Sequence, residues 1–275
     1  MPLGRIGATF RDAIVGTLEG VGDVVGTTIE VTRSNSVNAL RGVSDIGTEA
    51  SSVLMDGVSG VVQGAIQVGS DVGSSAKGAA IGTILGFGEI ATVTVGTLSD
   101  TVRAAIKGTS EVGGDVAEAG RGAAEGAIST TKQLSISLED AAAGIAQGAI
   151  QAAYEVGSDL VITARSVVKG TAVGAHEAGS DVLTAVRESA RGLIKGTSEV
   201  GGDLAGVARN TVEGAIEGAE SIGVKAEDAA SAAATGAVDA ASDISSAAGR
   251  TVRDAVTGTI GGVRVIVKAP FKDGE

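Results

Sequence analysis

Apolar residues recur along this chain with a helical spacing, in units of 22 residues. When the sequence is divided from Gly16 onward, repeat positions 3 and 9 are apolar in every unit. The apolar repeat positions 2, 6, 9, 13, 17 and 20 follow one another by three or four residues, whereas a strand would alternate with a period of two. Two 11-residue periods in six turns give a nearly straight hydrophobic stripe. The pattern therefore predicts an all-α protein of 22-residue (2 × 11) amphipathic helical repeats.

The repeat divides the chain into three parts. We expect a lead-in helix over residues 1–15, an array of twelve repeats over 16–269, and a tail over 270–275 that leaves the helix at Pro270. Residues 129–140 (STTKQLSISLED) lose the repeat pattern. Ser137 and Asp140 there have the spacing of a capping box, so this segment is a candidate bend.

Glycine occupies repeat position 1 in ten units and position 5 in nine. A glycine inside a helix costs about 1 kcal/mol relative to alanine, so it needs a compensating role. Small residues four apart allow two helix backbones to approach closely. We therefore predict that a set of glycines packs helix against helix: Gly60, Gly64, Gly108, Gly170, Gly174, Gly192, Gly196, Gly214 and Gly218.

Two arrangements of the helices are open. Long Gly/Ala-rich helices packed side by side are favoured, because the apolar phase continues unbroken from position 9 to position 13. A Glu at position 8 would also be disfavoured at a helix C-terminus. The alternative is an array of about twelve short antiparallel helices, an α-solenoid or stacked hairpins, in which Val-Gly-Ser-Asp at positions 9–12 ends one helix and caps the next.

Charged residues flank the apolar stripe on two sides. One edge is acidic at repeat positions 8 and 12, and the opposite edge is basic at position 18, every 44 residues. If helices pack laterally, the basic edge of one meets the acidic edge of the next, which selects register more than it adds energy. The predicted inter-helix charge edges comprise Glu111, Asp115, Glu155, Asp159, Glu199, Asp203, Arg33, Lys77, Arg121, Arg165, Arg209 and Arg253.

Composition narrows the function classes. The net charge of −12 disfavours nucleic acid as a partner. The chain has no Cys and a single His, His176, which gives no metal cluster or catalytic dyad. Residues 86–91 match a dinucleotide fingerprint but fall within the repeat, without the surrounding strands. We therefore expect no enzymatic activity and no cofactor. Because the first twenty residues lack the long apolar stretch of a signal peptide, we expect a cytoplasmic protein.

Residues 60–81 (GVVQGAIQVGSDVGSSAKGAAI) illustrate a period and composition that resemble the 11- and 22-residue amphipathic repeats of perilipins, synucleins and exchangeable apolipoproteins. The resemblance implies a peripheral coat on lipid droplets or membranes, with neutral lipid as partner. The glycine spacing and the two charged edges instead favour a structural protein that self-assembles as a homo-oligomer into a tube, filament or shell-like scaffold. Self-assembly is the preferred expectation, and the lipid coat is the alternative. A single-chain solenoid scaffold is a further possibility.

Overall fold

The computed structural model describes residues 4–18, 23–41 and 49–267 and contains twelve α-helices and one β-hairpin in those ranges. The fold is all-α apart from the short hairpin, as the apolar period predicted. The helices are α1 (Arg5–Leu18), α2 (Val24–Arg41), α3 (Glu49–Gln67), α4 (Val72–Gly88), α5 (Val95–Glu111), α6 (Val116–Ser129), α7 (Leu138–Glu155), α8 (Leu160–Glu177), α9 (Val182–Glu199), α10 (Leu204–Ile222), α11 (Ala226–Ile244) and α12 (Ser246–Val256). The strands are β1 (Gly258–Ile260) and β2 (Val263–Val265).

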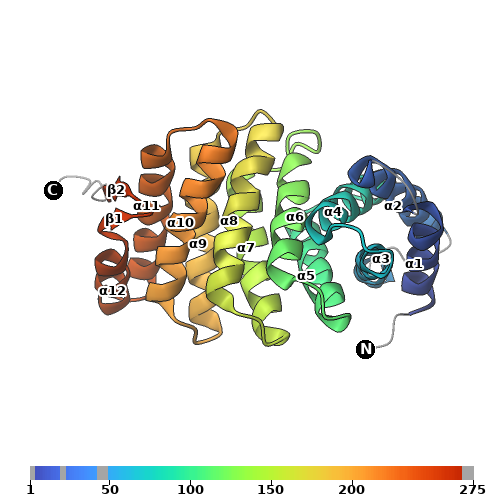
Figure 1. Ribbon diagram of the computed structural model, residues 1–275, viewed down its shortest axis with the longest axis horizontal. Helices are drawn as coiled ribbons and strands as arrows, with labels where there is room; N and C mark the ends of the chain where they lie inside the picture. Colours follow the sequence, from blue (N-terminus) through green and yellow to red (C-terminus); the bar gives the residue numbers. More distant parts are fainter. Residues whose placement is uncertain (1–3, 19–22, 42–48, 268–275) are drawn as a thin grey trace.

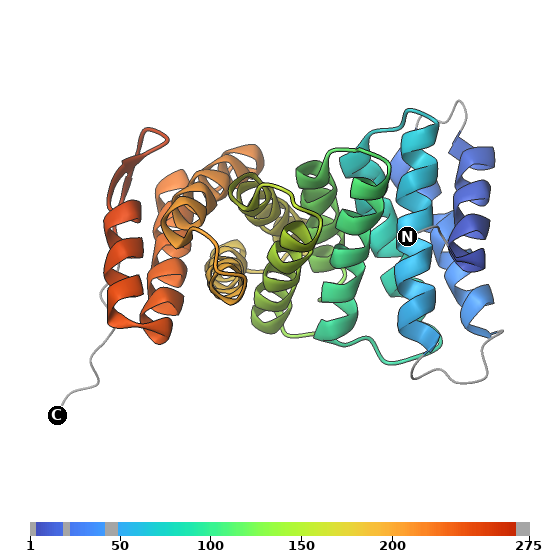
Figure 2. The ribbon, with the colours of Figure 1, turned by 90° about the horizontal axis from the view of Figure 1, so that it is seen from below.

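The helices form two rows, because each packs most extensively on the helix two places along the chain. Odd-numbered helices from α1 to α11 make one row and even-numbered helices from α2 to α10 make the other, with α12 against α10 and α11. Consecutive helices run antiparallel, so the helices within a row are parallel. The array is elongated, with the N-terminal helices at one end and α12 and the hairpin at the other (Figure 1). Helix directions turn along the array, so that α1–α4 lie lengthwise in Figure 2 while helices near its middle are seen almost end-on.

The preferred expectation of long continuous helices is wrong, and the array of short antiparallel helices is the correct alternative. Six of the repeats break at positions 9–12, where the glycine of position 10 adopts a positive φ, as Gly157 does at +70°. In that turn Gly157 and Ser158 donate backbone hydrogen bonds to the carbonyls of Tyr154 and Ala153, which is a Schellman ending. Asp159 then caps α8 by accepting from the backbone N–H groups of Val161 and Ile162.

The same turn recurs along the chain. The glycines with positive φ at position 10 are Gly69, Gly113, Gly157, Gly179, Gly201 and Gly223. In the degenerate segment 129–140, Ser135 occupies this position with φ +55°, and Ser137 caps α7 by accepting from the backbone N–H of Asp140. The candidate bend is thus the loop between α6 and α7, one of several such connections.

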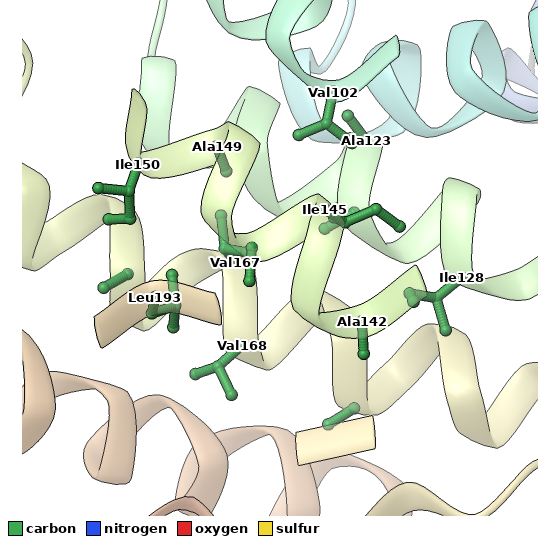
Figure 3. Close-up of a cluster of buried hydrophobic side chains, with 14 of the residues drawn as sticks. Val102, Ala123, Ile128, Ala142, Ile145, Ala149, Ile150, Val167, Val168 and Leu193 are labelled. Carbon is green, nitrogen blue, oxygen red and sulfur yellow. The ribbon is translucent and has the colours of Figure 1, made fainter. Parts of the chain in front are cut away.

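The core is thin and filled by small side chains. Most fully buried residues are Ala, Val or Ile, and Phe10 is the one buried aromatic in the described part of the chain. Facing helices can approach closely because alanine and glycine alternate with branched residues, which fills the space between two rows without large side chains. Figure 3 shows this packing between α5, α6, α7, α8 and α9, where the labelled residues are Val102, Ala123, Ile128, Ala142, Ile145, Ala149, Ile150, Val167, Val168 and Leu193.

The C-terminal end departs from the expected helix. Instead of helix up to residue 269, a two-stranded antiparallel hairpin follows α12, with a turn at Gly261 and Gly262. Both turn glycines have positive φ (+56° and +80°), as a type I′ hairpin requires, and the flanking residues are β-branched. Local turn chemistry therefore overrides the repeat at its last unit. The predicted tail, 270–275, lies outside the described residues. No helix of the described chain combines the length and apolarity needed to cross a bilayer.

Candidate interaction surfaces

Glycines bring each helix onto the backbone of the preceding helix in its row. A methyl group placed on Gly170 of α8 would overlap the carbonyl oxygen of Arg121 in α6, and one on Gly214 of α10 would overlap that of Arg165 in α8. In both pairs the glycine lies 49 residues after its partner, which is five more than the 44 residues between successive helices of a row. α8 and α10 are thus each displaced along the preceding helix of the row by about 7.5 Å, at 1.5 Å per residue.

The other predicted packing glycines lie in equivalent places. Gly60 and Gly64 of α3 face Gly7 and Arg11 of α1, and Gly108 of α5 faces Ser59 of α3. The remaining contacts join Gly174 to Glu125, Gly192 to Ala143, Gly196 to Gln147 and Gly218 to Lys169 and Ala172. All these close approaches are made between helices of one chain.

Side-chain pairs accompany the glycine contacts, in most cases at a sequence separation of 48 or 52 residues. Arg165 of α8 pairs with Glu213 (3.0 Å) and Glu217 of α10, which lie 48 and 52 residues later. In the odd row, Arg103 and Lys107 of α5 pair with Glu155 of α7 at 2.9 and 2.5 Å. In these pairs the cation belongs to the earlier helix and the carboxylate to the next helix of the row.

The predicted acidic edge divides into two groups with different roles. The glutamates at position 8 each contact the preceding helix of the odd row. Glu111 contacts Gln63, and Glu155 contacts Arg103 and Lys107. Glu199 contacts Gln147 and Gln151. The hydrogen bond from Lys107 lowers the pKa of Glu155, and the positive charge of Arg103 adds to this.

Asp115, Asp159 and Asp203 at position 12 instead cap their own helices. Each accepts two backbone N–H bonds in the first turn, because the chain starts a new helix immediately after this position. They therefore act within a helix rather than between helices.

Of the predicted basic edge, Arg33, Lys77 and Arg165 reach acids on a later even-row helix. Arg121 pairs with Glu118 and Glu125 of its own helix, and Arg209 lies 3.6 Å from Glu213, also on its own helix. Arg253 lies half-buried in the last turn of α12.

The densest group of charges lies over α6 and joins three helices of the even row. We call Lys77, Glu118, Arg121, Glu125 and Glu177 the α6 charge cluster. The ammonium of Lys77 in α4 contacts Glu125 of α6 at 2.8 Å and Glu177, the last residue of α8, at 2.7 Å. The guanidinium of Arg121 contacts Glu118 at 2.7 Å and Glu125 at 3.1 Å. The cluster thus ties α4, α6 and α8 together.

Burial and hydrogen bonding oppose each other in this cluster. Burial alone would lower the pKa of Lys77, but its hydrogen bonds to Glu125 and Glu177 raise the pKa above its ordinary value. The side chain of Glu125 is only 9% exposed and lies between the two cations. Gly73 makes room for the guanidinium of Arg121, because a methyl group there would overlap it. Removing one partner would leave the nearly buried carboxylate of Glu125 with fewer of its charge contacts.

Sequence reasoning missed the partners of the basic residues. Glu125, Glu213 and Glu217, like Arg103 and Lys107, occupy repeat positions 22 and 4, which show no constant charge over 22 residues. At position 22 of the even row the charge alternates from one helix to the next, as Glu125, Lys169 and Glu213 show, and so repeats every 88 residues. The identical segments KGTSEVGGD at 107–115 and 195–203, which are 88 residues apart, were the available signal.

Chemistry-bearing residues are sparse in the described ranges. His176 lies in the last turn of α8, and a search of those ranges finds no group of three His, Cys, Asp or Glu side chains that could hold a metal ion. The surface carries three open grooves of roughly 480–550 Å³, two of them between helices of the odd row and one along α2. They are surfaces that suit a polypeptide better than an enclosed small molecule.

No protein-family model and no curated protein matches this chain.

Proposed function

We propose that this protein is a non-enzymatic structural scaffold, an α-solenoid that presents its extended helical surfaces to other proteins. One observation carries the proposal: from α3 onward, successive helices of a row are joined by recurring kinds of contact, a glycine against the neighbouring helix and, at several of these interfaces, polar pairs 48 or 52 residues apart. Arrays of this kind are stabilised by nearest-neighbour interfaces and use their long surfaces for binding.

The α6 charge cluster supports a stiff array. Neighbour-to-neighbour contacts alone leave an array free to bend at every interface, whereas Lys77 connects α4 to α8 across α6. A scaffold that must hold its partners at fixed separations benefits from such a tie.

Self-assembly through the glycine-lined faces stays a prediction of the sequence. In the structure, the glycines predicted for that purpose contact helices of the same chain. The apolar side of each helix is likewise buried inside the array. A homo-oligomer or a coat on neutral lipid would therefore need a different surface, or would need the helices of the array to separate and expose their apolar sides.

Light scattering and small-angle X-ray scattering on the purified chain test the proposal. The scaffold predicts a particle near the monomer mass of 26.6 kDa, elongated, with a helical signal that ignores neutral lipid vesicles. A large assembly whose mass grows with protein concentration would support self-assembly instead. Helicity that appears only with vesicles would support the lipid coat.

A further inference from the structure

We propose that the groove between α9, α11 and β2 binds an extended, carboxylate-bearing peptide segment of a partner protein, which adds as a strand to the free edge of β2. The groove has a volume of about 530 Å³. It is lined by Leu183 and Arg187 of α9, Ser231 and Ala232 of α11, Arg264 of β2 and Ile266, which follows β2. α11 and the hairpin lie at the C-terminal end of the array, several helices away from α6 (Figure 1).

The hairpin register leaves one edge of β2 facing this groove. Ile260 and Val263 flank the two-residue turn, so they form a hydrogen-bonded pair, and the next pair, Thr259 and Arg264, is not hydrogen-bonded. The backbone N–H and C=O of Arg264 therefore point away from β1. Ile266 directly follows β2, which ends at Val265. These two residues are the ones that line the groove.

The position of the sheet is consistent with an added strand. β1 contacts α10 and β2 contacts α11. The next strand position beyond β2 thus lies over the groove between α11 and α9. Unpaired strand edges are templates for a further strand, in which backbone bonds give affinity and side chains give specificity.

The side chains of the groove define the chemistry of the peptide. Arg264 makes no ion pair within the described ranges, and Ile266 is 62% exposed although it is a large apolar residue. On an added strand, an acidic residue opposite Arg264 and an apolar residue beside Ile266 would complement them. Glu227 and Asp228 also line the groove, but they lie in the first turn of α11, where the helix dipole stabilises their charge.

A library of linear twelve-residue peptides displayed on phage, selected against the whole chain, tests this inference. We expect enriched peptides to contain a carboxylate and apolar residues in alternation. Ile266→Pro removes the backbone N–H of the residue that follows β2 and should weaken binding of the enriched peptides about tenfold, and Arg264→Ala should weaken it by a similar factor. Thr259→Pro is the matched control, because it removes an outward N–H from the opposite edge of the same hairpin, and it should leave affinity within about twofold.

Three results would overturn the inference: no enrichment above background, enriched peptides that bind Ile266→Pro and Arg264→Ala as tightly as the parent, or equal losses in Thr259→Pro and Ile266→Pro. Circular dichroism of each variant verifies that the helical array is intact. The scaffold proposal is tested by particle mass and shape, so it can stand or fall independently of this groove.

Discussion

Replacing Gly170 by alanine isolates the role of close helix approach. The new Cβ would lie 3.0 Å from the carbonyl carbon of Arg121 and closer still to its oxygen, where ordinary contact needs 3.4 Å or more. α8 must therefore move away from α6, and overpacking of this kind costs about 1–3 kcal/mol. Alanine returns up to about 1 kcal/mol of helix propensity, so we expect a net loss of about 1–2 kcal/mol.

Gly16→Ala is the matched control for this experiment. Gly16 occupies the same repeat position in α1, but no atom would lie within 4 Å of its new Cβ. It should gain stability, by up to about 1 kcal/mol, from propensity alone. The difference between the two variants measures the packing cost and should appear as a thermal midpoint several degrees lower for Gly170→Ala, at about 2–4 °C per kcal/mol. Equal stabilisation of both variants would refute the reasoning.

Further predictions concern charge, turn geometry and dilution. Lys77→Met leaves the buried carboxylate of Glu125 with one cation fewer and should cost about 1–3 kcal/mol in urea denaturation, so an unchanged midpoint would contradict the cluster's role. The hydrogen bond from Lys107 lowers the pKa of Glu155 in the folded protein, so the pair stabilises the fold above the unfolded pKa of about 4.3, and this stabilisation is lost as the pH falls through the folded pKa. Glu155→Gln should therefore lose less stability on acidification than the parent protein. Parallel curves of stability against pH would contradict this. Ser135→Gly relieves a positive φ and should raise the thermal midpoint by about 1–4 °C, whereas a decrease would show that the serine side chain is needed there. Helicity measured by circular dichroism should persist on dilution to nanomolar protein, since the apolar faces are covered within the chain, and its loss would favour an obligate oligomer.

The apolar period was sufficient to predict the fold class, but not where the helices end. The linker from Val156 to Asp159 has four residues, which is close to one helical turn, so the apolar phase resumes after the break as if the helix had continued. The decisive signal was local: a glycine able to adopt positive φ followed two residues later by a capping aspartate. The Glu at position 8 that argued for continuous helices is tolerated at a helix C-terminus, because residues such as Lys107 pair with Glu155 there.

The contact surfaces were predictable in part. The glycine spacing predicted close approach between helix backbones. In the structure Gly170 lies against the backbone of Arg121, which belongs to a neighbouring helix of the same chain. The partner acids, such as Glu213, were not visible at 22 residues because they alternate with cations in successive helices of a row. The groove beside β2 could not be predicted, because the repeat pattern predicted helix where the structure has the hairpin.

The separations of 48, 49 and 52 residues that recur from α3 onward make this part of the molecule modular in length. Insertion or removal of one helix pair, 44 residues, preserves the parallel relationship within each row but brings like charges together in the even row, where Glu125, Lys169 and Glu213 alternate in sign. A change of two pairs, 88 residues, restores both geometry and charge. Recombination between the two identical KGTSEVGGD segments would produce such a change without altering any residue at the junction, so longer and shorter versions of this array could arise by unequal exchange in its coding sequence.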